Sequence, residues 1–407
     1  MKKRFPKISN KRKCITGSIL FAAGFALMYI SRISRAFAQW YSVHVYPVWV
    51  NVTGRFMGIF AFSVSEVLLY TVLLIVILTF FRLVIRAVRK CAGKKDFLAW
   101  GCRLYILAGV LFSLYALNCG INYHRQSFSE SSGIEMESYT AEELKSVCLW
   151  LTEEVNSLSG SVARDEGGVM RLAQRSGESK AAARALDQEA VRAMHRLGRE
   201  YPELAGFYPN PKGLLCPWIL SVQQLTGVYS PFTVEANYNS GVIDYNIPFT
   251  MCHELSHLRG FMQEEEANFI AFLASIGSED IYFQYSGYLM GWRYCMNVLY
   301  KADYDAWEEV REQLSGDIEA DLAANRDFWD QYDGRIAEAA NKVNDTYLKA
   351  NDQSEGVESY NKMVDLIVAY RFNPARRQAL SRIGRRRTHC LQVHPSVFSD
   401  ISARPFS

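Results

Sequence analysis

Disulfide patterning and a strong charge bias are both missing from this sequence. The chain has nine cysteines in 407 residues, and no two are arranged as C-x-x-C. Beyond residue 122 an odd number remains, at Cys148, Cys216, Cys252, Cys295 and Cys390, so a disulfide framework is not indicated. The formal net charge is only +3, which says little about partners, and we expect no nucleic acid to bind.

Long apolar runs are also absent beyond Asn122, where charged residues recur every few positions. Before that point three runs approach the ~20 residues that cross a bilayer as a helix. These predicted spans cover about residues 14–30, 59–81 and 98–118. Glu66 and Arg103 each lie near the start of a span, where we expect their side chains to reach the membrane interface.

The loss of apolar runs near Tyr123 divides the chain. We predict a membrane domain at residues 1–122 and a soluble domain at 123–372. Residues 373–407 form a basic tail that we expect to be solvated and disordered.

Basic residues around the spans predict the orientation, because positive charge near a span stays in the cytoplasm. The N-terminal segment carries seven: Lys2, Lys3, Arg4, Lys7, Lys11, Arg12 and Lys13. The connection after the second span carries six: Arg82, Arg86, Arg89, Lys90, Lys94 and Lys95. The loop between the first two spans has only Arg32, Arg35 and Arg55. We therefore expect a multi-pass protein of the cell membrane whose soluble domain is extracytoplasmic.

An alternative for the first span is a cleaved signal peptide, because Ala36-Phe37-Ala38 follows it as an A-x-A-like site. Cleavage would leave the topology unchanged, since the other two spans fix it.

The soluble domain has mainly helical periodicity. Thr140 and Glu143 fit a capping box, and a strand-like segment at 227–237 contains Pro231, which would confine it to an edge or bulge. Further helices are predicted at 181–201, 282–300, 305–332 and, after Gly334, 335–351. The predicted fold is α+β and mostly helical, with three N-terminal transmembrane helices and a small sheet just before the most informative motif.

That motif is His253-Glu254-Leu255-Ser256-His257. On a helix the two histidines lie four residues apart on one face and can bind one Zn²⁺. Glu254 lies beside them, where it can act as the general base on a zinc-activated water. The pattern predicts one zinc ion per chain.

A catalytic zinc site needs a third protein ligand. Gly260 can end the first helix in a left-handed turn, and an acidic helix start follows. Glu264 is the preferred ligand, because Asn268 then falls at i+4 as a hydrogen-bond partner behind it. Glu265 and Glu266 remain alternatives, as does a purely electrostatic role at the helix N-terminus.

Weaker candidates surround the motif. Thr233, Glu235 and Asn237 would lie on an edge strand that could bind extended peptide by β-addition, or on an ordinary structural strand. Tyr285 could donate a hydrogen bond to an oxyanion, although a core tyrosine is an equal alternative, as it is for Tyr288. Cys252 is expected to pack in the core.

The predicted function is peptide-bond hydrolysis by a membrane-anchored zinc metallopeptidase acting on peptides or proteins at the cell surface. The alternative is a non-catalytic membrane sensor or scaffold that holds zinc in the same site.

Glu264-x-x-Ala267-Asn268 resembles the E-x-x-A-D or E-x-x-A-N helix of gluzincin metallopeptidases, which implies that Glu264 is the third zinc ligand. The short connection from His257 is instead similar to the metzincin turn, but Gln263 occupies the place of the metzincin histidine.

The whole chain also resembles an uncharacterised family of bacterial three-span membrane proteins with a zincin-like motif. Besides the motif helices, the matching stretches are residues 122–125, 211–215, 231–237, 248–250, 285–288 and 356–360. This resemblance implies a bacterial cell membrane and a zincin-like domain, and it supplies no substrate.

Overall fold

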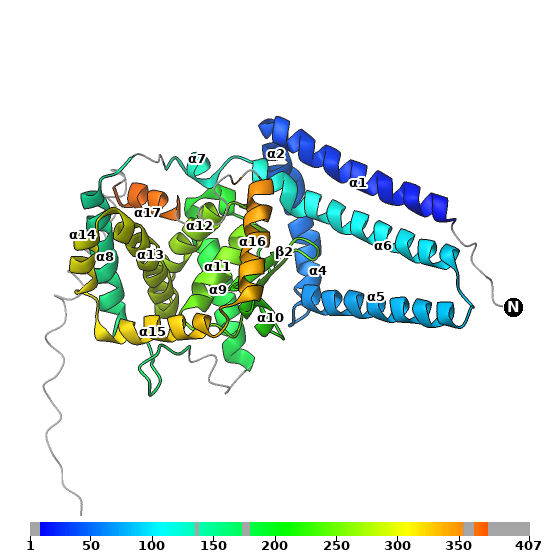
Figure 1. Ribbon diagram of the computed structural model, residues 1–407. Helices are drawn as coiled ribbons and strands as arrows, with labels where there is room; N and C mark the ends of the chain where they lie inside the picture. Colours follow the sequence, from blue (N-terminus) through cyan, green and yellow to red (C-terminus); the bar gives the residue numbers. More distant parts are fainter. Residues whose placement is uncertain (1–8, 135–137, 173–179, 352, 354–361, 373–407) are drawn as a thin grey trace, which may run out of the picture.

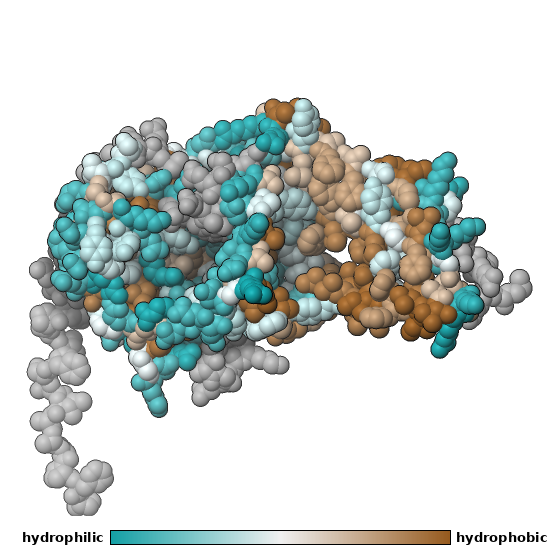
Figure 2. Space-filling model, viewed as in Figure 1, coloured by the Kyte–Doolittle hydropathy of each residue, from teal (hydrophilic) through white to brown (hydrophobic). Residues whose placement is uncertain are grey.

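Three helices in the computed structural model are long and apolar enough to cross a membrane. They are α1 (Asn10–Ile33), α5 (Val64–Val88) and α6 (Lys94–Tyr115). The structure describes residues 9–134, 138–172, 180–351, 353 and 362–372, so the basic tail and the 356–360 stretch lie outside the described residues. Figure 1 shows the three helices extending to one side of the globular part, and Figure 2 shows hydrophobic surface concentrated on them.

The predicted spans are confirmed as helices, with shifted ends. α5 begins at Val64 and not near Ile59, because the Ser63 hydroxyl caps the helix by accepting the Glu66 N–H. α6 continues through a π-helical turn, η3 (Ala116–Gly120), and a 3₁₀ turn, η4 (Ile121–His124). α1 packs along α6, whereas α5 diverges from that pair (Figure 1).

The connection between α1 and α5, treated above as a loop, is helical. It consists of α2 (Arg35–Trp40), η1 (Tyr41–Val45), α3 (Tyr46–Trp49), η2 (Val50–Gly54) and α4 (Arg55–Met57). Its buried residue Tyr46 donates a hydrogen bond to the Leu258 carbonyl at 3.0 Å and lies 2.8 Å from the Tyr229 hydroxyl. The connection is therefore part of the globular core.

The globular part is mostly helical, as predicted. Its larger helices are α8 (Ala141–Ser159), α9 (Lys180–Glu200), α11 (Asn246–Leu258), α12 (Glu264–Ile276), α13 (Ile281–Ala302), α14 (Tyr304–Arg311), α15 (Gly316–Asp330), α16 (Arg335–Ala350) and α17 (Met363–Phe372). Short helices α7 (Phe128–Ser132), η6 (Pro202–Leu204) and α10 (Trp218–Ser221) complete the described set. The core forms where α11, α12 and α13 pack on one another, with α8 on the far side of α13.

Local sequence patterns predicted the positions of several of these helices correctly. The Thr140–Glu143 capping box is present at the start of α8. One long helix predicted at 305–332 is wrong, because the chain breaks into α14 and α15, with Ser315 in an extended conformation before Gly316.

A three-stranded sheet covers one side of α11. It contains β1 (Lys212–Gly213), β2 (Gly227–Ser230) and β3 (Glu235–Tyr238) in the order β1-β3-β2. β1 pairs with β3 in parallel, and β2 pairs with β3 in antiparallel, matching Val228 with Asn237. The single strand predicted at 227–237 is thus a hairpin, and Pro231 lies in its turn, where its missing N–H leaves no ladder bond unmade.

Buried charges join this sheet to the membrane helices. The Glu235 carboxylate on β3 accepts the Val64 and Ser65 N–H groups at the start of α5 and pairs with Lys212. Glu66 accepts the Leu215 and Cys216 N–H groups. Glu66 is buried, so its carboxylate is held by these backbone donors and does not face solvent. It ties α5 to the globular domain.

Candidate metal centre

The histidine motif lies on α11, whose turns are almost wholly buried between the sheet and α12. As the motif predicts, Gly260 ends the helix region with a left-handed φ of 95°. A Cβ there would also lie 3.1 Å from the Arg125 guanidinium and 3.3 Å from the Tyr46 ring. The tight turn lets α12 begin only four residues later and return beside α11.

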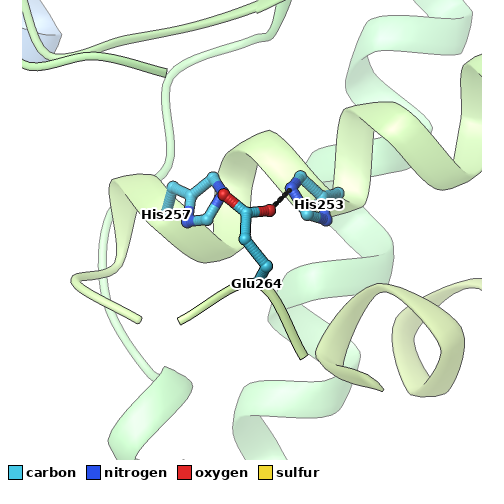
Figure 3. A group of neighbouring side chains, drawn as sticks. All are labelled: His253, His257 and Glu264. Atoms are coloured by element: carbon cyan, nitrogen blue, oxygen red, sulfur yellow. Dashed lines mark ion pairs between the residues drawn. The ribbon is translucent and has the colours of Figure 1, made fainter. Parts of the chain in front are cut away.

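This turn brings three side chains together (Figure 3). One ligand-type atom from each of His253, His257 and Glu264 lies within 4.8 Å of the others. The Glu264 carboxylate lies between the imidazoles, 3.3 Å from His253 Nε2 and 3.7 Å from His257 Nε2. Glu264 is therefore the glutamate that the fold places against the histidines.

The other two glutamates of the helix start have different neighbours. Glu265 accepts a hydrogen bond from Gln353 at 2.8 Å. Glu266 accepts the Phe128 N–H at 2.7 Å, at the start of α7. Neither belongs to the cluster found among the described residues.

The two imidazole rings each direct the Nε2 nitrogen towards Glu264. His257 Nδ1 lies 2.8 Å from the Phe261 carbonyl, so this nitrogen carries a proton and Nε2, which faces Glu264, is the nitrogen that could bind a cation. His253 Nδ1 is buried and has no hydrogen-bond partner among the described residues. Two imidazole nitrogens and one carboxylate form the donor set of many catalytic zinc sites, and their convergence fits a divalent cation.

Electrostatics couple the three groups in the absence of a cation. Burial lowers the pKa of His257, but the Glu264 carboxylate outweighs this effect and raises the pKa to about 9. Burial alone would raise the pKa of Glu264, but the two imidazoles hold it well below its ordinary value. The protonated His257 imidazole therefore balances the Glu264 carboxylate, a role that a metal cation could take over.

Glu254 lies beside this cluster and is buried. Its Oε2 atom has no hydrogen-bond partner among the described residues. Burial raises its pKa to about 7, against the lowering effect of the neighbouring histidines. Gly227 at the start of β2 packs directly on it, since a Cβ there would lie 2.5 Å from Glu254 Oε1. The missing side chain at Gly227 keeps room for the carboxylate.

The cluster opens into a cavity of about 600 Å³. Its walls come from α11, α12, β2, α13, α15, α16 and the end of the third membrane helix. Five tyrosines line it: Tyr115, Tyr123, Tyr229, Tyr294 and Tyr347. Tyr115 and Tyr123 lie at the end of the third membrane helix, and the other three lie on β2, α13 and α16, so no local pattern in the sequence could have grouped the whole set.

Several predicted site residues do not have the expected positions. Tyr285 is fully buried away from the cavity and donates its hydroxyl to Asp321, so its prediction as an oxyanion donor is wrong. Asn268 lines the cavity with Glu264 one helical turn along α12, as expected, and it also contacts Tyr294; its role behind Glu264 stays a prediction. Cys252 is fully buried in the core, as expected.

The predicted substrate strand is also misplaced. Glu235 and Asn237 are buried on β3, the central strand, which has no free edge. Thr233 is buried in the hairpin turn, where it bonds Ser230. The strand edge beside the motif belongs to β2.

A comparison with protein families adds one finding. A family described as "Protein of unknown function (DUF3810)" matches residues 41–368, which is most of the chain. The chain belongs to this family. The match includes the helical connection from η1 onward, α5, α6 and all residues of the candidate metal centre, and it agrees with the resemblance to an uncharacterised membrane family. No curated protein and no solved structure matches the chain.

Proposed function

We propose that this protein is a membrane-anchored zinc metallopeptidase with a gluzincin-type site. The observation that carries the proposal is the convergence of His253, His257 and Glu264 within 4.8 Å, with Glu254 on the wall of the same cavity. A surface helix with a chance match to the motif would not bury these groups or supply a third ligand from another helix.

The proposed reaction is hydrolysis of a peptide bond. The two Nε2 atoms and the Glu264 carboxylate would hold the zinc ion, which when bound supplies Lewis acidity that polarises a carbonyl and activates water. Glu254 takes a proton from the attacking water and later gives it to the leaving amine. The C–N bond breaks, the water oxygen joins the carbonyl carbon, and both protons of the water end on the products.

We propose that the substrate peptide binds along the free edge of strand β2. Gly227 and Val228 line the cavity, and within the described part of the chain β2 pairs with a strand, β3, on one side only. A peptide extended along this edge could form main-chain hydrogen bonds and pass beside Glu254. Tyr294, which lines the cavity, replaces Tyr285 as the candidate oxyanion donor.

We further propose that the globular part is extracytoplasmic in a bacterial cell membrane and that its substrates are at the cell surface. The basic residues at the N-terminus and after α5 support this orientation. Reporter fusions at Asn122 and Ser407 test it, and both should report a location outside the cytoplasm. Cytoplasmic reporter activity at either position would refute the orientation.

Zinc content and peptide hydrolysis, measured side by side in the purified full-length protein, test the function. We expect one zinc per chain. Glu254→Gln should keep zinc and lose roughly 10²–10⁴-fold in turnover, because it removes only the general base. Glu264→Gln should lose zinc affinity as well, because it removes an anionic ligand.

Glu265→Gln is the matched control and should keep both zinc and activity, since Glu265 bonds Gln353 outside the cluster. Zinc retained by Glu264→Gln would contradict the ligand assignment. Full zinc in the wild type with no hydrolysis, unchanged by Glu254→Gln, would instead support a non-catalytic sensor or scaffold.

A further inference from the structure

The height of the cavity above the membrane can be estimated from α6. This helix starts with Lys94, Lys95 and Asp96, and its apolar stretch begins at Phe97. About 20 residues cross the hydrocarbon core, so the chain reaches the opposite edge at about residue 116. Tyr115 and Cys119 lie on either side of that position, and both line the cavity. One wall of the cavity therefore lies at the membrane boundary.

The second span places the membrane boundary at the same height, by an independent count of residues. Arg82 marks one end of its apolar stretch, and about 20 residues counted back from Phe81 reach about residue 62. The first turn of α5 lies there, bound by Glu235 of the sheet. The sheet beside α11 therefore stands on the membrane boundary.

The length of strand β2 gives the distance from this membrane boundary to Glu254. Its first residue, Gly227, packs on Glu254. At the other end, the Pro231 carbonyl accepts a hydrogen bond of 2.8 Å from Asn118, at the end of the third membrane helix. Four residue steps at ~3.3 Å give about 13 Å. Glu254 is thus separated from the boundary by no more than four or five residues of extended chain.

This distance is fixed by buried contacts. The Glu66 carboxylate bonds the loop at Leu215 and Cys216, and Tyr46 bonds Leu258 at the end of α11. The surface at this level is apolar: the side chains of Leu215 and Trp218 are 66% and 57% exposed. Exposed tryptophan beside membrane spans favours the interface, which keeps the globular part against the bilayer.

We infer, on the basis of the proposed peptidase function, that the substrates are polypeptides held in the bilayer by an apolar segment. The bond that is cut lies within about five residues of the point where that segment leaves the membrane, because an extended chain covers ~3.3 Å per residue. Anchoring in the same bilayer raises the effective concentration of such a segment at the cavity, an advantage that a soluble peptide lacks.

The test uses the full-length, zinc-loaded protein in lipid nanodiscs. The probe is a single apolar span followed by a randomised segment of about 30 residues, the second half of which lies beyond the reach of β2. A matched probe has the same segment without the span. We expect cuts to cluster in the first five residues or so after the span and to be at least tenfold fewer in the probe without it. Cuts spread evenly along the segment, or equal cutting of both probes, would overturn the inference.

A binding measurement separates this inference from the peptidase proposal. In the Glu254→Gln variant, a photoreactive benzoylphenylalanine replaces Asn344, which lines the cavity on α16. The matched control places it at Tyr300, which is exposed on α13 and does not line the cavity. Preferential crosslinking of the anchored probe at position 344, near the span, supports the inference even if the wild type cuts nothing, a result that would overturn only the peptidase function. Equal crosslinking of both probes would overturn the inference itself.

Discussion

The carboxylates of two regions of this molecule, the membrane junction and the candidate metal centre, have different hydrogen-bond partners. At the membrane junction, Glu66 and Glu235 each accept two backbone N–H groups. At the candidate metal centre, the buried Glu254 has one oxygen without a partner among the described residues, and the half-buried Glu264 faces two imidazoles. Burial alone therefore does not distinguish structural carboxylates from candidate functional ones; the number of fixed donors does.

The physical reason is the cost of burying charge. A buried carboxylate is stable when hydrogen-bond donors or a cation replace the water it has lost. The junction supplies fixed donors, so its carboxylates hold helices and loops together. The candidate metal centre supplies few fixed hydrogen-bond donors to its carboxylates. A site for a cation and a proton acceptor requires such carboxylates.

The largest stability effect is expected at the junction. Glu235→Ala should lower the free energy of unfolding by about 3–5 kcal/mol, because it leaves the buried Lys212 without its counter-charge and the start of α5 without an acceptor. Chemical unfolding in detergent measures this. Glu254→Ala is the matched variant at the metal centre and should cost far less, since it removes no donor's partner.

The double variant Lys212→Met with Glu235→Leu sharpens this contrast. It should recover part of the lost stability, because it removes both charges. Equal losses for Glu235→Ala and Glu254→Ala would contradict the distinction between the two regions.

An intermediate loss of stability is expected when Gly227, where the sheet contacts the motif helix, is replaced by alanine. Gly227→Ala would place a methyl group 2.5 Å from Glu254 Oε1 and 2.7 Å from Thr250 Cγ2. We expect a loss of about 1–3 kcal/mol in stability, typical of overpacking, together with a displaced Glu254 and reduced hydrolysis at full zinc content.

Gly160→Ala is the control for Gly227→Ala, since a Cβ at Gly160 meets nothing within 4 Å. Thermal unfolding, zinc analysis and peptide hydrolysis of the two variants test whether Gly227 confines Glu254. Wild-type stability and activity in Gly227→Ala would show that the strand does not confine Glu254.

The smallest effect concerns a carboxylate outside both regions. Burial raises the pKa of Asp187 from 3.8 to about 7, and a hydrogen bond from Tyr238 offsets this only in part. The folded state therefore holds a proton that the unfolded state releases. Stability from this group is complete below about pH 4 and is lost as the pH rises towards 7, by roughly 1–2 kcal/mol after allowance for partial exposure.

Unfolding measured from pH 4 to 8 in the wild type and in Asp187→Asn tests this sign. The difference in stability between the two proteins should change across that range in the variant's favour as the pH rises. A constant difference would show that Asp187 titrates normally.

Local patterns were sufficient to predict much of the candidate site. Helical spacing places His253 and His257 on one face, and Gly260 followed by an acidic helix start predicts the return of Glu264. The three apolar runs likewise predict three membrane helices. These features depend on residues within a few positions of one another, so geometry along one or two helices is enough to derive them.

Tertiary structure alone decided the surroundings of that site. The choice of Tyr294 over Tyr285 depends on which helix face meets the cavity, and the position of β3 inside the sheet depends on its pairing with β1. The burial of Glu66 depends on a loop some 150 positions later in the chain. The sequence by itself determined the shared face of His253 and His257 and the three spans, because their periodicity is local. Only the fold determined that the end of the third membrane helix borders the cavity, because that contact joins segments whose pairing leaves no local pattern.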